Sequence, residues 1–219
     1  QGERKTFVRG TLCDDKRLDL CKQVVGPAGV SPLMEALLAD SQRGKHVSSL
    51  LLGNNVCGNG LGHGVAEAIR GGLRLNVWYI AGNRLDADGL EPVVEALKGD
   101  THTTQLWLKR NPLRPRAAPL LADLLHHNAT LTVLDVVNTG LMDEGALVVL
   151  RAVLSSPTLK HIYLEANAIT PQPFETLLKL GVEQSPTVLE TLSVGCNPLG
   201  SRGMAALCAL LAGLERRGG

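Results

Sequence analysis

Apolar and polar positions follow a short pattern that recurs along most of the chain. The pattern is apolar-x-apolar-x-x-Asn-x-apolar, and Leu106, Leu108, Asn111 and Leu113 show it in full. The position of its asparagine, here called the register position, falls at residues 55, 83, 111, 139, 167 and 197, so the interval is 28 residues four times and 30 once. A fixed interval of this length is the sequence signature of a repeat protein.

Each copy of the pattern combines two hydrophobic periods. The alternation of Leu106 and Leu108 predicts a short strand with one apolar face. Ten and fourteen residues after the register position, pairs such as Val93 and Leu97 have helical spacing, so a helix is expected after each strand. One such unit cannot bury its own apolar side, and stacked neighbours give a continuous core. The sequence therefore predicts an α/β solenoid of strand-helix units.

The register position is polar although its neighbours are apolar. Asparagine occupies it from Asn55 to Asn197, except in the fourth unit, which has Thr139. A side-chain amide both donates and accepts, so at the turn after each strand it can bond backbone groups that no sheet partner reaches. Thr139 keeps a hydroxyl donor but lacks the amide. We therefore expect the turn of the fourth unit to be looser or bonded differently.

Extended by one apolar position, the pattern reads Leu-x-x-Leu-x-Leu-x-x-Asn-x-Leu, and Leu189, Leu192, Val194, Asn197 and Leu199 match it. This resembles the leucine-rich repeat proteins of the ribonuclease-inhibitor-like class. The resemblance implies a horseshoe with a concave parallel β-sheet, convex helices and about seven strand-helix units. Function follows less directly, because the class includes the inhibitor, small-GTPase activators, bacterial effectors and the sensing domains of NOD-like receptors in innate immunity. The sensing domains match this chain better than the inhibitor does. The inhibitor is acidic and thiol-rich, whereas this chain has a net charge of +1 and five cysteines.

The first 46 residues do not carry the full pattern. Val30, Leu33 and Leu37 indicate a degenerate first unit with a helix, and Pro32 lies near the expected helix start, where a missing N–H does no harm. Terminal units cover the open end of a solenoid core, so atypical sequence is expected there. The predicted organisation is an N-terminal cap and degenerate first repeat over residues 1–46, followed by repeats of about 28 residues over 47–219 that end in a helix.

Composition narrows the classes of function. The net charge of +1 argues against a chain built as a whole around nucleic acid or an anionic membrane. No apolar run approaches the roughly eighteen residues of a membrane span. Five cysteines without a C-x-x-C pair fit a reducing compartment, so we expect a cytoplasmic protein. The histidines show no ligand spacing with these cysteines, and no metal site is expected.

Motifs for catalysis are missing from the sequence. It contains no G-x-S-x-G and no H-E-x-x-H, and acidic residues such as Asp86 and Asp143 lie where they complement helix starts. The stretch Gly58 to Gly64 is placed like a phosphate-binding loop, yet His63 stands where G-x-G-x-x-G requires glycine. We therefore expect no enzyme activity, no cofactor and no small-molecule substrate.

The scarce aromatic residues gather in one expected column. If Leu106 and Leu108 face the core, the residue between them faces solvent on the concave sheet. Through the units this column reads Leu51, Tyr79, Trp107, Asp135, Tyr163 and Ser193, whereas Trp78 falls in a core column. Exposed aromatics also simply favour strands. Aromatic anchors ringed by charges are nevertheless typical of interface hot spots. The predicted partner-binding site is Tyr79, Trp107, Lys109, Asp135, His161, Tyr163 and Glu165.

A basic cluster defines a competing surface. Lys109, Arg110, Arg114 and Arg116 lie within eight residues at the strand end and loop of the third unit. Beside Trp107 they could bind phosphate and stack bases, so RNA is an alternative partner, although solvated loop charge is commoner. A small-GTPase-activating regulator is a second alternative. The favoured prediction is a non-catalytic macromolecular recognition domain whose concave face binds a protein.

Overall fold

The computed structural model describes residues 5–6, 10–44, 47–181 and 187–215. Its strands are β1 (Lys5–Thr6), β2 (Thr11–Leu12), β3 (Arg17–Asp19), β4 (Ser49–Leu51), β5 (Val77–Tyr79), β6 (Gln105–Trp107), β7 (Val133–Asp135), β8 (His161–Tyr163) and β9 (Thr191–Ser193). Its helices are α1 (Val30–Gln42), α2 (Gly60–Arg70), α3 (Ala87–Leu97), α4 (Ala118–His127), α5 (Met142–Ser155), α6 (Gln172–Leu180) and α7 (Gly200–Glu215). Two short 3-10 turns, η1 (Pro27–Gly29) and η2 (Pro115–Ala117), precede α1 and α4.

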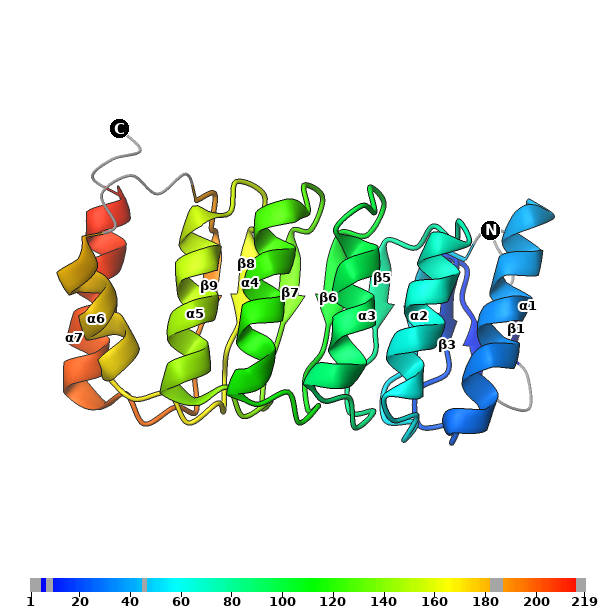
Figure 1. The fold of residues 1–219 in the computed structure, drawn as a ribbon, viewed down its shortest axis with the longest axis horizontal. Coiled ribbons are helices and arrows are strands. Elements are labelled where there is room, and N and C mark those ends of the chain that lie inside the picture. Colours follow the sequence, from blue (N-terminus) through cyan, green and yellow to red (C-terminus); the bar gives the residue numbers. More distant parts are fainter. Residues whose placement is uncertain (1–4, 7–9, 45–46, 182–186, 216–219) are drawn as a thin grey trace.

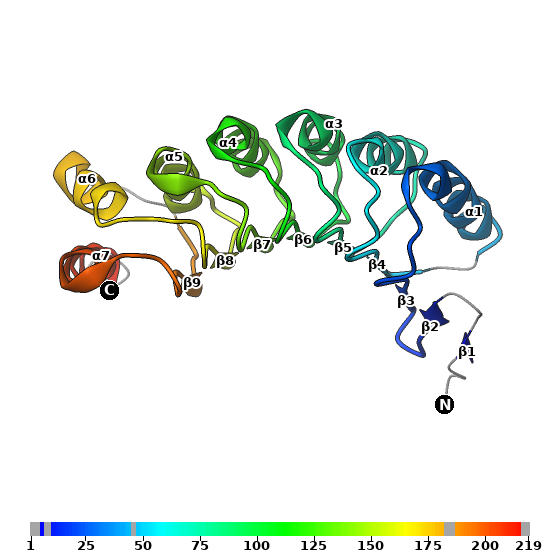
Figure 2. The ribbon, with the colours of Figure 1, turned by 90° about the horizontal axis from the view of Figure 1, so that it is seen from below.

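The strands form one sheet in chain order. Within the described residues, β1, β2 and β3 pair antiparallel, and the seven strands from β3 to β9 run parallel. A helix follows each parallel strand, and the strands line the inner side of an arc whose outer side is covered by the helices (Figure 1, Figure 2). The predicted α/β solenoid, with its concave sheet, convex helices and about seven units, is confirmed.

The core lies between the sheet and the helices. One core column runs through Leu50, Trp78, Leu106, Leu134 and Ile162, all 0% exposed, in the register that pairs each with the next. The helices contribute residues at the predicted helical spacing, and Val65, Val93, Leu121 and Val149 are also 0% exposed. Where α2 meets α3, a Cβ at Gly62 would overlap the carbonyl oxygen of Gly89, so the close helix approach requires glycine there.

The register asparagines form a buried hydrogen-bond ladder between units. The Nδ2 of Asn83 donates to Leu52 O at 2.8 Å, and its Oδ1 accepts from the N–H groups of Asn55 at 3.2 Å and Cys57 at 3.4 Å. Each amide therefore ties its own turn to the preceding one, as the pattern predicts. Thr139 keeps the bond within its own unit, because its Oγ1 donates to Val136 O at 2.7 Å as Asn111 Nδ2 does to Leu108 O at 2.8 Å. It is bonded differently toward the preceding unit, because among the described residues its side chain makes no hydrogen bond there.

The N-terminal segment adds one unit to the stack. Strand β3 and helix α1 form it, and Gln23 takes the register position, because the N–H groups of Gln23 and Val25 donate to Asn55 Oδ1 at 3.0 and 3.1 Å. Pro32 is the third residue of α1, where a missing N–H leaves no bond unmade. The predicted boundary between residues 46 and 47 touches residues 45–46, which lie outside the described residues, so that division stays a prediction.

Candidate functional site

The predicted aromatic column exists on the concave sheet. Tyr79 pairs with Trp107, Trp107 with Asp135, and Asp135 with Tyr163 in the registers of strands β5 to β8. Parallel pairing without any shift follows from the constant repeat interval, because each unit places the same strand position beside its neighbour. The three aromatic side chains are therefore aligned across the arc, and each is half-buried.

The three rings form a continuous stack. The ring centroids of Tyr79 and Trp107 lie 6.0 Å apart at an interplanar angle of 38°. Those of Trp107 and Tyr163 lie 5.9 Å apart at 21°, which is a stacked arrangement. Such pairs contribute about 0.5–1.5 kcal/mol beyond the area they bury. The aromatic stack, here defined as Tyr79, Trp107 and Tyr163, is thus one surface.

Polar neighbours hold the central indole in place. Gln105, two residues earlier on the same face, accepts a hydrogen bond from Trp107 Nε1 at 3.1 Å. The Nζ of Lys109 lies 5.3 Å from the centroid of the Tyr79 ring and 5.5 Å from that of Trp107, so its charge interacts with both ring faces. Gln105 was absent from the predicted site, although its position on the same face as Trp107 could have indicated it.

Asp135 lies beneath the aromatic stack. It was expected to face solvent, and that expectation is wrong, because Asp135 is only 2% exposed. Its Oδ1 accepts from Val137 N–H at 2.9 Å, and Lys109 Nζ lies 3.7 Å from Oδ2. Burial raises the pKa of this carboxyl above its ordinary value, against the opposing effects of the Val137 N–H and Lys109. The negative charge of Glu165 raises the pKa further.

The remaining members of the predicted site lie at the C-terminal side of the stack. Glu165 Oε1 accepts from Ser193 Oγ, whereas Oε2 is buried and has no partner among the described residues. His161 Nδ1 lies 3.0 Å from Thr191 Oγ1, and Nε2 lies 3.9 Å from a Glu190 carboxylate oxygen. Both residues are half-buried on the same face as the rings. The structure therefore brings six of the seven predicted partner-binding residues together on the concave face, and Asp135 lies buried beneath them.

The basic cluster is divided by the fold. Lys109 lies on the concave face beside Asp135. Arg116 belongs to η2, and its guanidinium is 2.5 Å from an Asp88 carboxylate oxygen. Arg110 and Arg114 line a pocket between the loops of the third and fourth units. Four residues that are close in sequence thus occupy three different places, and the expected single basic surface is not formed.

A family model described as "Leucine Rich repeat" matches residues 127–150 and 185–208. These segments contain strands β7 and β9 with the beginnings of the helices that follow. The chain is a leucine-rich repeat solenoid. A Tonsoku-like protein of Danio rerio is similar to it, with 26% identity over 214 residues that cover 92% of this chain and 15% of the relative. The chain therefore corresponds in length to a small part of that protein.

A solved structure, "Leiomodin-1 Actin-Binding Site 2 (ABS2)", is also similar to this leucine-rich repeat solenoid. The identity is 15% and the TM-score 0.47, over 85% of this chain and 98% of the other.

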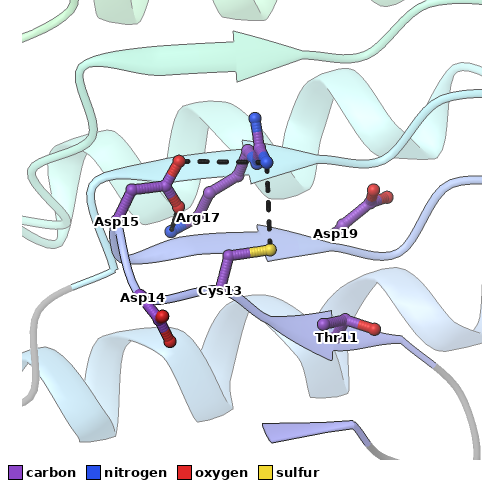
Figure 3. A pocket seen from close by; sticks show the side chains of 6 residues that line it. All are labelled: Thr11, Cys13, Asp14, Asp15, Arg17 and Asp19. Atoms are coloured by element: carbon purple, nitrogen blue, oxygen red, sulfur yellow. Dashed lines mark hydrogen bonds and ion pairs between the residues drawn. The ribbon is translucent and has the colours of Figure 1, made fainter. Parts of the chain in front are cut away.

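One further depression lies at the N-terminal end of the solenoid. Thr11, Cys13, Asp14, Asp15, Arg17 and Asp19 line it beside β2 and β3 (Figure 3). The guanidinium of Arg17 lies 3.9 Å from Cys13 Sγ and 3.8 Å from Asp15 Oδ2. Its positive charge is therefore paired with the Asp15 carboxylate inside the depression. Across the described residues, no group of three or more His, Cys, Asp or Glu side chains is arranged to hold a metal ion.

Two other observations concern the chain as a whole. All five cysteines lie in the described part of the chain, and each is a free thiol. Of the helices in that same part, none combines the length and the apolar character that crossing a bilayer requires.

Proposed function

We propose that this chain is a non-catalytic protein-recognition domain and that the aromatic stack on its concave face anchors a protein partner. Leucine-rich repeat domains generally mediate protein-protein interaction, and a concave solenoid face is the usual place for it. The observation that carries the proposal is the continuous contact of Tyr79, Trp107 and Tyr163 at centroid distances of 6.0 and 5.9 Å. Large aromatic anchors of this kind dominate interface energetics.

The stack is ordered before a partner arrives. The indole of Trp107 is bonded to Gln105, and the Lys109 ammonium lies over two of the rings. Immobilising a side chain on binding costs about 0.5–1.5 kcal/mol, and preorganisation removes that cost. Glu165 adds a negative charge beside the rings, because its half-buried side chain lies on the same face as Tyr163. A partner that places an apolar group on the rings and a donor near Glu165 fits this surface.

Several finer assignments belong to the same proposal. The 28-residue interval and full helices support the ribonuclease-inhibitor-like class, and the balanced charge supports a sensing horseshoe like that of NOD-like receptors in innate immunity. The free thiols of all five cysteines support a cytoplasmic location. RNA binding is the alternative, supported by Arg110 and Arg114 in one pocket. Activation of a small GTPase remains an alternative from the resemblance alone.

A capture experiment tests the proposal. The full chain is immobilised, and proteins retained from lysate are compared between the wild type and a Tyr79→Ala/Trp107→Ala/Tyr163→Ala variant. We expect one or more proteins to be retained by the wild type and lost by the triple variant, because each anchor contributes about 2 kcal/mol or more. Leu180→Ala is the matched control, because it truncates an exposed apolar side chain at the end of α6.

Two measurements make the comparison decisive. Circular dichroism and thermal unfolding establish that the triple variant is folded. Retention at rising salt separates the alternatives, because phosphate contacts weaken steeply with salt, whereas an aromatic anchor depends on it only modestly. Equal retention by the wild type and a folded triple variant would rule out the aromatic stack as the docking site, and steep salt dependence would favour RNA.

A further inference from the structure

The asparagine ladder is interrupted once inside the solenoid. In the regular ladder the N–H of each register residue donates to the side-chain oxygen of the next register residue. Asn83 N–H reaches Asn111 Oδ1 at 2.8 Å, and Thr139 N–H reaches Asn167 Oδ1 at 3.1 Å. For Asn111 the next register residue is Thr139, which has no amide oxygen. Its hydroxyl donates to Val136 O at 2.7 Å.

The interruption leaves a donor without an acceptor. Among the described residues, the N–H of Asn111 has no hydrogen-bond partner, and Asn111 is only 1% exposed. The second donor of this turn is satisfied locally, because Leu113 N–H bonds to Asn111 O at 2.8 Å across Pro112. Buried backbone N–H groups are very rarely left unpaired in native proteins. The Asn111 N–H therefore requires an acceptor from outside the described residues, such as solvent or a ligand.

A basic pocket lies at this place. It has a volume of about 370 Å³ and is lined by Arg110, Asn111, Arg114, Asn138 and Thr139, among others, and it contains no carboxylate among its lining residues. Arg110 and Arg114 are exposed, and neither guanidinium has an ion-pair partner among the described residues. Asn138 adds a side-chain amide that can donate. Two cationic donors and two neutral donors thus surround one small space.

We propose that this loop pocket binds a single oxyanion, namely the carboxylate or phosphoryl group of a side chain on the protein that the concave face recognises. One oxygen of the anion accepts from Asn111 N–H, in the place that the missing amide oxygen leaves empty. Arg110 and Arg114 neutralise its charge with charge-assisted hydrogen bonds. The molecule that carries the oxyanion is here called the carrier. That the carrier is a protein rests on the proposed function, whereas the anion site itself does not.

The placement of the other basic residues favours a protein over RNA as the carrier. A nucleic acid needs a continuous row of cations along its backbone. Here Arg116 is paired with Asp88, and Lys109 is engaged with Asp135 and the rings of the concave face. One pocket with one unpaired backbone donor suits one anionic group. Strand β6 links the two surfaces, because Trp107 ends the strand and Arg110 follows three residues later.

Phosphate titration followed by amide NMR tests the anion site. Inorganic phosphate is added to the full ¹⁵N-labelled chain at constant ionic strength, and we expect a saturating shift of the Asn111 amide signal. Arg110→Gln and Arg114→Gln each remove a charge-assisted hydrogen bond, so each weakens phosphate binding about tenfold or more. Arg84→Gln is the matched control, because Arg84 is exposed in the corresponding loop of the second unit, where the ladder is complete.

A second variant fills the gap without changing any charge. Thr139→Asn supplies the missing amide oxygen to Asn111 N–H, so phosphate binding is lost while both arginines remain. Thermal unfolding verifies that this variant is folded. Lack of a saturating shift at Asn111, an equal loss of affinity in Arg84→Gln, or unchanged binding in Thr139→Asn would each overturn the anion site.

The carrier is tested separately. Single-stranded RNA and peptides that contain aspartate or phosphoserine are titrated into the wild type and the Arg110→Gln/Arg114→Gln variant. Peptide binding that the double variant loses supports a protein carrier, and RNA binding that it loses overturns that part of the proposal. The Tyr79→Ala/Trp107→Ala/Tyr163→Ala variant should bind inorganic phosphate like the wild type. Failure of the aromatic docking site is therefore distinguishable from failure of the pocket.

Discussion

The rings of Trp107 and Tyr163 stack at a centroid distance of 5.9 Å although their strands are not neighbours. Strand β7 lies between β6 and β8, and two strand spacings amount to about 9.6 Å. The two side chains therefore lean toward each other across β7. Asp135, which occupies the same column on β7, is covered as a result and is 2% exposed. The aromatic stack and a buried carboxylate are thus parts of one arrangement.

Removal of one ring should change the titration of the carboxyl below it. Tyr163→Ala opens the cover over Asp135, so water reaches the carboxylate and the pKa of Asp135 falls toward its ordinary value of about 3.9. A pH titration of the side-chain carboxyl ¹³C signals measures this pKa. Tyr79→Ala is the control, because Tyr79 contacts Trp107 from the side away from β7. An unchanged pKa in Tyr163→Ala would show that the rings do not shield Asp135.

The pH dependence of stability should reveal the same buried charge. Because the pKa of Asp135 is raised in the folded state, the folded chain binds this proton more tightly than the unfolded chain. Its contribution to the free energy of unfolding is full below about pH 3.9 and is lost as the pH rises through the folded-state pKa. Asp135→Asn keeps an acceptor for the Val137 N–H and removes the charge. We expect it to increase stability at neutral pH in urea unfolding, and not at pH 3.

Most of the fold could be predicted from the repeat pattern. Leu106 and Leu108 enter the core, and Trp107 faces the concave side, because a strand alternates its faces and the constant interval repeats that choice in every unit. Pattern alone also identified Thr139 as the exception in the asparagine column. These features depend on the local periodicity and on the constant repeat interval, and both can be read directly from the sequence.

Other features depend on where side chains and loops turn in space. The bond between Gln105 and Trp107, and the cover over Asp135, follow from side-chain rotamers that periodicity does not specify. The basic cluster separated because the chain turns sharply after β6, with left-handed φ values of 59° at Arg110 and 58° at Arg114. The unpaired N–H of Asn111 becomes apparent only when the hydrogen bonds between two neighbouring units are compared, and the sequence of a single repeat does not specify those bonds.

The cysteines should differ widely in reactivity. Burial raises the pKa of the Cys57 thiol to about 11, and its side chain is 0% exposed, so at pH 8 it has neither thiolate nor access. Cys196 and Cys208 are exposed. With a disulfide reagent at pH 8, we expect these two to react within the first, fast phase and Cys57 only after unfolding. Peptide mapping of the modified thiols checks the order, and rapid labelling of Cys57 would contradict it.

The asparagine ladder should stabilise the middle of the solenoid more than its end. Asn83 and Asn197 make the same kinds of hydrogen bond, because each amide donates to a carbonyl of the preceding unit and accepts from two N–H groups there. Asn83 is 0% exposed, whereas Asn197 is half-buried at the last unit. Water can therefore replace the lost bonds at Asn197 and not at Asn83.

Truncation of the two residues measures this difference. Each buried group left unsatisfied costs about 1–3 kcal/mol, and Asn83→Ala leaves several, so we expect it to lower the free energy of unfolding by about 3 kcal/mol or more. Asn197→Ala should lower it by about 1 kcal/mol, the net contribution of a typical hydrogen bond that water can replace. Urea unfolding of both variants provides the comparison. Equal losses would mean that the last turn is as closed to solvent as the second, and that burial does not set the strength of the ladder.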